Sequence, residues 1–359
     1  MITCRRALAA TGWLGPSRLL IENGVIAAVE PHVGSTDFDL LSAGFVDLQV
    51  NGIDGIDVCR AERDQWCELD DLLLAQGTTS WCPTLVTMSR DRYAPALARI
   101  AAAMGDQRLH ATILGTHLEG PFLGTAIGAH RSDMVTPIDL GWISALPDHV
   151  RIVTLGAEQT VAAQAVELLA GRGVLVSIGH STASDSQLDA ASLAGATMVT
   201  HLYNAMSGLH HRTPGVAAWA MTHDSISASI IADGVHVHPR MIRLAFQTLG
   251  PERMVLVTDA VAWMSGGAGP VSIEHRDGAP RLVDGTLAGS ALRMDAAIRL
   301  CVDSGVPLDH ALWAASRNPA RSVGMFDRGS IGIGLRADLV AMSPQLMVQQ
   351  VWTAGVQVD

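Results

Sequence analysis

The stretch Thr197-Met-Val-Thr-His-Leu-Tyr-Asn-Ala-Met206 is a short apolar run that ends at a histidine and continues as a polar loop. Two other segments have the same order: Glu119 follows the run Thr112–Leu118, and His180 comes two residues after Val174–Ile178. A barrel of parallel strands gathers its active-site residues where each strand ends and its loop begins. The three segments therefore predict strands of one barrel, with a carboxylate and two imidazoles on the same rim.

The rest of the chain after residue 44 repeats this alternation of short β-like runs and longer helical patterns. The predicted strands are Phe45–Val50, Thr79–Val86, Thr112–Leu118, Ile152–Ala157, Val174–Ile178, Thr197–Thr200, Ile226–Ala232 and Met254–Thr258. The predicted helices are Asp64–Ala75, Ala94–Met104, Val161–Gly171, Ser184–Ala194 and Pro239–Leu249. Polar residues fall at or just past the ends of the runs, namely Gln49, Asn51, Glu119, Glu158, His180, His201, Asp233 and Asp259. The sequence thus predicts an α/β fold, a TIM-type (β/α)8 barrel.

The two ends of the chain do not fit this alternation. Arg18–Glu30 is typical of a hairpin with an Asn-Gly turn. The tail segments Ala337–Met342 and Gln350–Val356 are typical of strands around glycine turns. We expect residues 1–43 and 331–359 to form a small β-sandwich domain beside a hydrolase barrel of residues 44–330.

Composition limits the possible partners and the compartment. Of the 359 residues, 48% are hydrophobic and 16% charged, which indicates a well-filled core. The net charge of −11 argues against nucleic acid or an anionic membrane as a partner. The five cysteines are scattered and without CxxC spacing, and no signal peptide or membrane-spanning run is recognisable. We therefore expect a reduced cytoplasmic location.

Glu119, His180 and His201 suit a catalytic zinc, because three protein ligands leave the fourth position open to water. Many metal barrels carry His-x-His at the end of strand one, where a second metal binds, but here Gln49 and Asn51 stand at those positions. Amides bind transition metals poorly. The chain also contains no lysine that could be carboxylated to bridge two metals. We expect one divalent metal per chain, with Zn²⁺ as the expected ion, although iron, cobalt or manganese would also suit these ligands.

The sequence allows more than one role for several other polar residues. Asp259 could cap a helix, but beside a metal it suits a general base that passes a proton to a leaving nitrogen. His117 would share the face of Glu119 deeper in the barrel, which favours a packing or supporting role. Arg212 and His236 could clamp a phosphate, or Arg212 could be an ordinary solvated side chain.

Nine motifs together resemble those of the N-acetylglucosamine-6-phosphate deacetylases of the amidohydrolase superfamily, over nearly the whole chain. They are Gly44–Gly52, His117–Phe122, Gly128–His130, Gly179–Ser181, Thr200–Met206, Arg212 with Pro214-Gly215, Ile231–His236, Leu256–Ala260 and Leu287–Leu292. The pair His117-Leu-Glu-Gly-Pro121 and Thr200–Met206 is the most specific.

The resemblance implies a role for each matching residue. Glu119, His180 and His201 match the metal ligands, and Asp259 matches the catalytic acid/base. The matching substrate contacts are Ala129, His130, Asn204, Ala205, Arg212, His236, Leu287, Ala288 and Gly289. Gln49 and Asn51 match the form of the family that holds a single zinc. A homodimer is also implied, with Arg212 reaching across the interface.

The resemblance further implies a substrate: a phosphorylated N-acetyl amino sugar, N-acetylglucosamine 6-phosphate, whose acetamide is hydrolysed to glucosamine 6-phosphate and acetate. Two alternatives stay open. N-acetylgalactosamine 6-phosphate or another N-acyl sugar differs by contacts as small as one hydroxyl. A catalytically inactive regulatory protein of the same fold would be expected to lose a ligand or the base, and all four residues are present.

Overall fold

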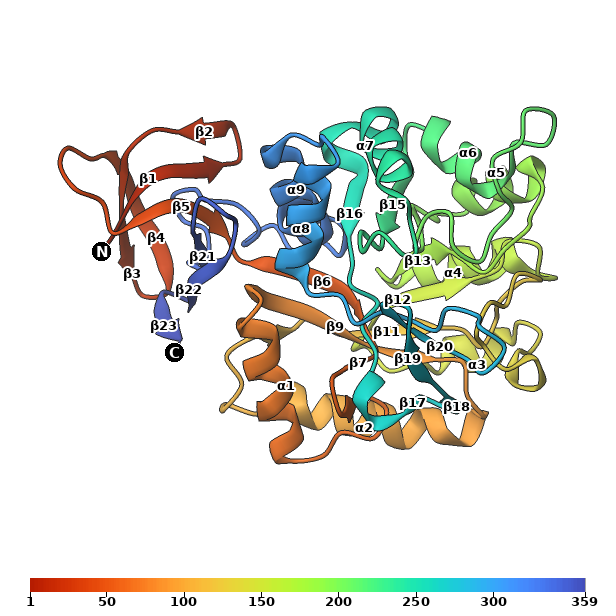
Figure 1. Ribbon diagram of the computed structural model, residues 1–359. Helices are drawn as coiled ribbons and strands as arrows, with labels where there is room; N and C mark the ends of the chain where they lie inside the picture. The colour runs from red at the N-terminus through yellow and green to blue at the C-terminus, as the bar shows by residue number, and fades with distance from the viewer. Residues whose placement is uncertain (359) are drawn as a thin grey trace.

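The computed structural model describes residues 1–358 as a barrel of parallel strands beside a smaller sheet that contains both chain ends (Figure 1). Within these residues the barrel has eight strand positions in the order in which the chain forms them. They are β6 (Phe45–Val50), β9 (Thr78–Val86), β10 (Thr112–Ile113) with β11 (Thr116–Glu119), β12 (Val150–Leu155), β13 (Leu175–Ile178), β14 (Met198–Val199), β15 (Ser227–Ile230) and β16 (Met254–Leu256). The predicted barrel is confirmed, and each predicted strand overlaps an observed one.

The third predicted strand, Thr112–Leu118, is observed as two pieces. β10 and β11 both pair with β9, so they continue one strand position that Leu114 and Gly115 interrupt. Gly115 has a φ of 139°, and a Cβ atom there would lie 2.6 Å from the carbonyl oxygen of His149. Only glycine fits this backbone without displacing its neighbour.

The barrel closes between β16 and β6, which share no regular ladder within residues 1–358. Closure occurs just beyond the strands instead. The amide of Asp259 donates to the carbonyl of Gln49 at 2.9 Å, and the amide of Asn51 donates to the carbonyl of Ala260 at 2.8 Å. This seam brings the predicted base next to the two strand-one amides.

The predicted helices are present as α1 (Asp64–Leu74), α2 (Tyr93–Met104), α4 (Ala162–Gly171), α5 (Asp185–Leu193) and α7 (Pro239–Arg253). The described residues contain further helices that the pattern did not predict: α3 (Leu140–Ser144), α6 (Gly215–Thr222), α8 (Met294–Asp303), α9 (Leu308–Ala315) and α10 (Arg317–Ser322). In α6 five of the eight residues are buried, so the periodic polar face that marks a helix is weak.

The barrel interior is apolar at depth. Inward side chains such as Leu48, Ile152, Leu175 and Val255 form one cluster, which Ala320 of α10 also joins. A larger apolar cluster fills the space between the strands and the surrounding helices. Strands that are covered on both faces in this way appear in the sequence as nearly continuous apolar runs. Their positions were therefore predictable.

The chain ends form a single sheet in the order β23 (Val356–Val358), β22 (Val348–Thr353), β21 (Leu339–Met342), β5 (Phe38–Ala43), β1 (Ile2–Ala9), β3 (Ser17–Glu22) and β4 (Val25–Pro31), and β2 (Gly12–Leu14) pairs with β1. The sheet curls so that Leu19 and Ile26 share one core with Leu339 and Trp352. The edge strand β4 also bonds to the segment before β21, where the amide of Ile26 donates to the carbonyl of Leu335 at 2.9 Å. The predicted sandwich is thus built from one sheet folded over its own core.

The glycine-rich segment after Asp259 is ordered into small elements rather than an open loop. It contains the 3₁₀ turn η3 (Trp263–Ser265) and two hairpins, β17 (Gly267–Ala268) with β18 (Val271–Ser272) and β19 (Glu274–Arg276) with β20 (Ala279–Arg281). Val261, Ile273 and Ala288 form a separate apolar cluster beneath them, which Ala129 also contacts. The hairpins thereby cover one side of the barrel rim.

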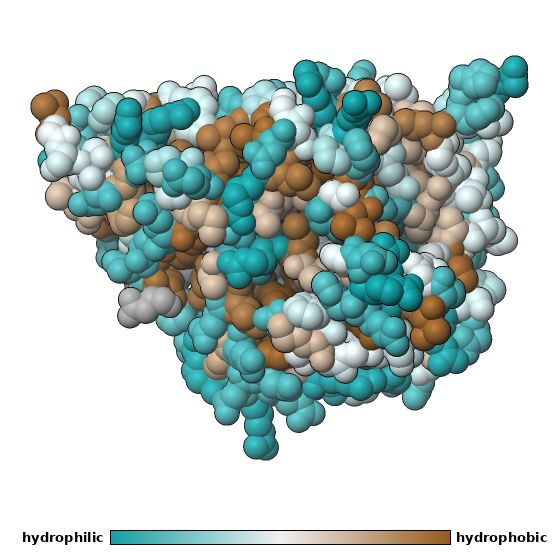
Figure 2. Space-filling view, viewed as in Figure 1, coloured by the Kyte–Doolittle hydropathy of each residue, from teal (hydrophilic) through white to brown (hydrophobic). Residues whose placement is uncertain are grey.

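The surface seen in Figure 2 carries hydrophilic residues over both the small sheet and the barrel, with apolar residues between them. None of the helices in the described part of the chain has the length and apolar character needed to span a bilayer.

Candidate metal and catalytic site

The three residues predicted as metal ligands meet at the rim of the barrel. Glu119 is the last residue of β11, while His180 and His201 each come two residues after the end of β13 and β14. Glu119 Oε1 lies 2.9 Å from His201 Nε2 and 3.3 Å from His180 Nε2, and the two ring nitrogens are 3.1 Å apart. All three side chains are buried. Three ligand atoms therefore converge on one point.

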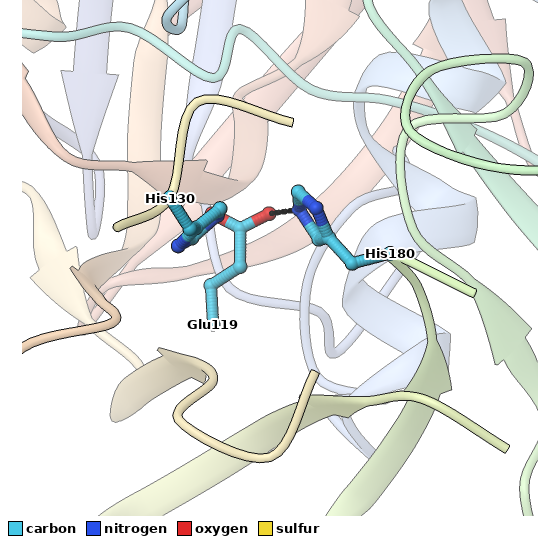
Figure 3. A group of neighbouring side chains, drawn as sticks. All are labelled: Glu119, His130 and His180. Carbon is cyan, nitrogen blue, oxygen red and sulfur yellow. Dashed lines mark hydrogen bonds and ion pairs between the residues drawn. The ribbon is translucent and has the colours of Figure 1, made fainter. Parts of the chain in front are cut away.

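His130 forms an outer part of the same group. The ligand atoms of Glu119, His130 and His180 lie within 4.8 Å of one another (Figure 3). His130 Nε2 is 4.0 Å from Glu119 Oε2, whereas His201 Nε2 is only 2.9 Å from Glu119 Oε1. On these distances His201 completes the inner trio, and His130 faces it from the loop after β11.

The hydrogen bonds of the trio require a positive charge at its centre. His180 Nδ1 lies 3.1 Å from the carbonyl oxygen of Ala126, which can only accept, so this nitrogen carries the proton. In the neutral ring Nε2 is then a lone pair that faces the Glu119 carboxylate. His201 Nδ1 has no hydrogen-bond partner within residues 1–358, so nothing fixes a proton on its Nε2. Two acceptors this close suit a shared cation.

The pKa shifts of Glu119 and His201 also indicate a positive charge between these side chains. Burial alone would raise the pKa of Glu119, but the adjacent imidazoles of His180 and His201 hold it well below its usual value. Burial would lower the pKa of His201, and the Glu119 carboxylate raises it instead. In the absence of a metal, a proton shared with His201 supplies the positive charge that the carboxylate needs.

Asp259 lies on the opposite side of the rim, three residues after β16. Its Oδ1 accepts hydrogen bonds from Asn51 Nδ2 at 2.7 Å and from Gln49 Nε2 at 3.1 Å. The same Gln49 nitrogen donates to Glu119 Oε1 at 2.9 Å, so one amide separates the two carboxylates. Burial, followed by the nearby Glu119 charge, raises the pKa of Asp259.

Several of these residues have unusual backbone angles. His180, His201 and Asp259 have φ values of 52°, 35° and 50°, in the left-handed region that residues other than glycine seldom adopt. Such conformations concentrate at functional sites, where the surrounding structure holds them in place. Here the left-handed residue follows a short strand each time and turns its side chain toward the barrel axis.

A cavity of about 280 Å³ opens above the trio. Most of the predicted substrate contacts line it: Ala129, His130, Asn204, Ala205, His236, Leu287, Ala288 and Gly289. His236 is held by Asp233, whose Oδ2 lies 2.6 Å from its Nδ1. Segments far apart in the sequence thus form one chamber around Glu119 and Asp259.

Arg212 is the exception among the predicted contacts. It is exposed and lies in a neighbouring groove of about 820 Å³, formed by residues 182–186 and 207–215. Within one chain, therefore, Arg212 does not line the cavity that holds Glu119 and Asp259.

The sequence pattern missed other lining residues, namely Val86, Thr87, Arg131, Ile231, Val261, Pro270, Val271 and Thr286. Arg131 and Thr286 are adjacent to the predicted contacts His130 and Leu287, so proximity in the sequence could have identified them. Pro270 and Val271 belong to the hairpin region after Asp259 and carry no chemical signal of their own.

Comparison with known proteins agrees with this geometry. The model of the amidohydrolase family matches residues 71–358. An N-acetylgalactosamine-6-phosphate deacetylase of Escherichia coli O157:H7 is 37% identical, over 99% of this chain and 98% of its own. An N-acetylglucosamine-6-phosphate deacetylase of Danio rerio is 35% identical, over 96% of this chain and 90% of its own.

Solved structures agree along the whole chain. A mutant N-acetylglucosamine-6-phosphate deacetylase of Mycobacterium smegmatis, in complex with N-acetylglucosamine 6-phosphate, has a TM-score of 0.92 at 33% identity, and the match covers 99% of this chain and 98% of that one. The Thermotoga maritima N-acetylglucosamine-6-phosphate deacetylase has a TM-score of 0.92 at 28% identity, covering 100% and 99% of the two chains. The resemblance noted in the motifs is confirmed, and the chain belongs to the amidohydrolase family.

Proposed function

We propose that this protein is an N-acetylglucosamine-6-phosphate deacetylase, a hydrolase of amino-sugar catabolism that cleaves the acetamide of its substrate to acetate and glucosamine 6-phosphate. The observation that carries the proposal is the meeting of Glu119, His180 and His201 opposite Asp259 at the base of one cavity. The relatives named above support the choice of substrate.

In this proposal Glu119, His180 and His201 hold one divalent metal, and zinc is the expected ion. The ligand set fits, because the Nε2 atoms of His180 and His201 lie within 3.3 Å of the same Glu119 oxygen and the group opens toward the cavity. When bound, such a metal supplies Lewis acidity toward a carbonyl oxygen and makes water more acidic. Gln49 and Asn51 donate amide N–H groups to Asp259, and their amide oxygens are poor ligands for a second transition metal.

Asp259 acts as the general base and then as the general acid. Its carboxylate takes a proton from the attacking water, whose oxygen bonds to the acetyl carbon. The carbon–nitrogen bond then breaks, and Asp259 returns the proton to the leaving nitrogen. Gln49 and Asn51 orient the carboxylate by fixing Oδ1, which leaves Oδ2 for the proton.

His130 is positioned to assist on the other side of the carbonyl group. Burial lowers the pKa of this ring to about 3, so it stays neutral and can donate one N–H to the developing negative charge on oxygen. Among the lining residues, Ala129, Asn204, Ala205, Leu287, Ala288 and Gly289 would hold the sugar ring, and His236 would contact the phosphate.

Arg212 would bind the phosphate of a second copy of the chain, because it lines a neighbouring groove and not the cavity of its own chain. We therefore propose a homodimer. The remaining expectations, a cytoplasmic location and domain limits at residues 43/44 and 330/331, stay predictions of the sequence.

A second substrate has specific support. The Escherichia coli relative at 37% identity is an N-acetylgalactosamine-6-phosphate deacetylase. The two sugars differ in the direction of one hydroxyl, and a site discriminates such a pair only through the polar groups that meet it.

The experiment is acetate release from both sugar phosphates and from unphosphorylated N-acetylglucosamine, with the bound metal quantified in the same sample. We expect turnover that requires the phosphate, and about one metal per chain. A higher kcat/KM on the galactosamine epimer would select the second substrate. Metal without turnover on any of the three would refute the proposed reaction.

A further inference from the structure

Below the proposed metal site, four buried side chains form a continuous hydrogen-bonded chain across the barrel. His117 Nε2 lies 2.8 Å from Thr154 Oγ1, Thr154 Oγ1 lies 2.8 Å from Thr200 Oγ1, and Thr200 Oγ1 lies 2.6 Å from Ser177 Oγ. All four side chains are buried. The reaction proposed above uses none of them.

The direction of every bond in this chain follows from one backbone group. His117 Nδ1 lies 3.0 Å from the carbonyl oxygen of Leu48, which only accepts, so Nδ1 carries the proton. In the neutral ring Nε2 must then accept from the hydroxyl of Thr154. Each hydroxyl has one proton, so Thr154 accepts from Thr200, and Thr200 accepts from Ser177. Each of these bonds has a single possible polarity.

Three of the four members lie on, or next to, a strand that leads to a proposed ligand. His117 precedes Glu119 by two residues on β11, so both side chains project from the same face of the strand. Thr200 immediately precedes His201, and Ser177 precedes His180 by three residues. Thr154 belongs to β12, which supplies no ligand, and its register partners are Glu119 on one side and Ser177 on the other. Thr154 thus connects the Glu119 strand to the two histidine strands.

We propose that His117, Thr154, Thr200 and Ser177 form a positioning layer that holds the strands of Glu119, His180 and His201 at the spacing the metal requires. The layer lies between the apolar lower interior and the polar rim, where a shift of one strand would move one ligand relative to the other two. Polar groups that orient metal ligands commonly contribute 10- to 100-fold in metal affinity. This inference rests on the metal site of the proposed function.

The chain offers a matched pair of variants. Thr154→Val removes both bonds of Thr154 at nearly constant shape, and it leaves His117 Nε2 without a donor and the Thr200 proton without an acceptor. Thr116→Val makes the same change on β11, but the buried hydroxyl of Thr116 has no hydrogen-bond partner within residues 1–358. The two variants therefore separate the loss of these bonds from the replacement of a buried threonine.

The test is Zn²⁺ affinity by competition with a chromogenic chelator, together with the absorption spectrum of the cobalt-loaded protein. We expect Thr154→Val to weaken Zn²⁺ binding by about tenfold or more and to change the cobalt spectrum. Thr116→Val should match the wild type, and Thr154→Ser, which restores a hydroxyl, should recover most of the affinity.

Equal Zn²⁺ affinity of Thr154→Val and the wild type would overturn the proposal, even if the metal-free variant unfolded at a lower temperature, because that result describes a purely structural threonine. Equal losses in Thr154→Val and Thr116→Val would overturn it as well. A wild-type chain that binds no metal would instead refute the metal site itself.

Discussion

The barrel rim has two parts whose charges are balanced differently: a metal half with Glu119, His180 and His201, and an amide half with Gln49, Asn51 and Asp259. On one half, Glu119, His180 and His201 bring a carboxylate and imidazole lone pairs within about 3 Å of one another, an arrangement that needs a cation. On the other half, the amide groups of Gln49 and Asn51 donate to the Asp259 carboxylate, which therefore needs none. The comparison teaches that the proposal of a single metal rests on where donors and acceptors lie, since carboxylates are present on both halves.

The largest expected effect comes from removing the charge on the metal half. Glu119→Gln should reduce bound metal from about one per chain to almost none and abolish turnover, because a neutral amide is a poor ligand. Metal analysis after dialysis measures this. The control is Glu158→Gln, which changes a carboxylate after β12 that bonds Thr125 and Ser181 outside the cavity, and which should keep its metal. A Glu119→Gln protein that retained its metal would remove the distinction between the halves.

The next effect separates metal binding from proton transfer. Asp259→Asn should retain the metal and lower kcat by about 10²–10⁴, the usual contribution of a general acid or base. Turnover and metal content are measured on the same preparation. Activity near the wild-type level would show that the amide half does not supply the base.

Stability should depend on pH through Asp47, which lies below the amide half and accepts a hydrogen bond of 2.6 Å from Thr258. Burial raises the pKa of Asp47 to about 7, although that hydrogen bond opposes the shift. In the unfolded chain the pKa is close to 3.9. The contribution of Asp47 to stability is therefore complete below about pH 4 and is lost as the pH rises through 7.

In the wild type, the free energy of unfolding should decline by up to about 4 kcal/mol between pH 4 and 7, about 1.36 kcal/mol for each of three pH units. Asp47→Asn should abolish this decline. Urea unfolding of the metal-free protein between pH 4 and 8 checks the slope, with the exposed Glu68→Gln as a control. Identical slopes for Asp47→Asn and wild type would mean that Asp47 is not the group responsible.

The smallest expected effect concerns the environment of Asp259. Asn51→Ala removes a donor that stabilises the ionised carboxylate, so the pKa of Asp259 should rise further. Because the base must be ionised, the acidic limb of the kcat/KM profile should move to higher pH, by up to about one unit. The Gln49 bond remains, which keeps the effect small. A shift toward lower pH would contradict the role assigned to the amide half.

The sequence by itself determined the barrel, because strands buried on both faces are mostly apolar runs, and because charged residues such as Glu119 and Asp259 come where those runs end. It also determined the hairpin of β3 and β4, where the Asn23-Gly24 turn adopts the positive φ values that these residues favour. The candidate ligands could be identified because their residue types suit a metal.

Only the tertiary structure decided which groups meet and in what relation. The helix α6 is buried over most of its length and carries little pattern, and the cavity wall of Pro270 and Val271 comes from a hairpin with no chemical signal. The placement of Arg212 in a neighbouring groove and the chain of bonds from His117 to Ser177 depend on contacts between residues far apart in the sequence. The local sequence determines the hydrophobic period of each element and the residue types it carries. The distances between side chains, and which of them donates a hydrogen bond to which, arise only once separate strands lie side by side.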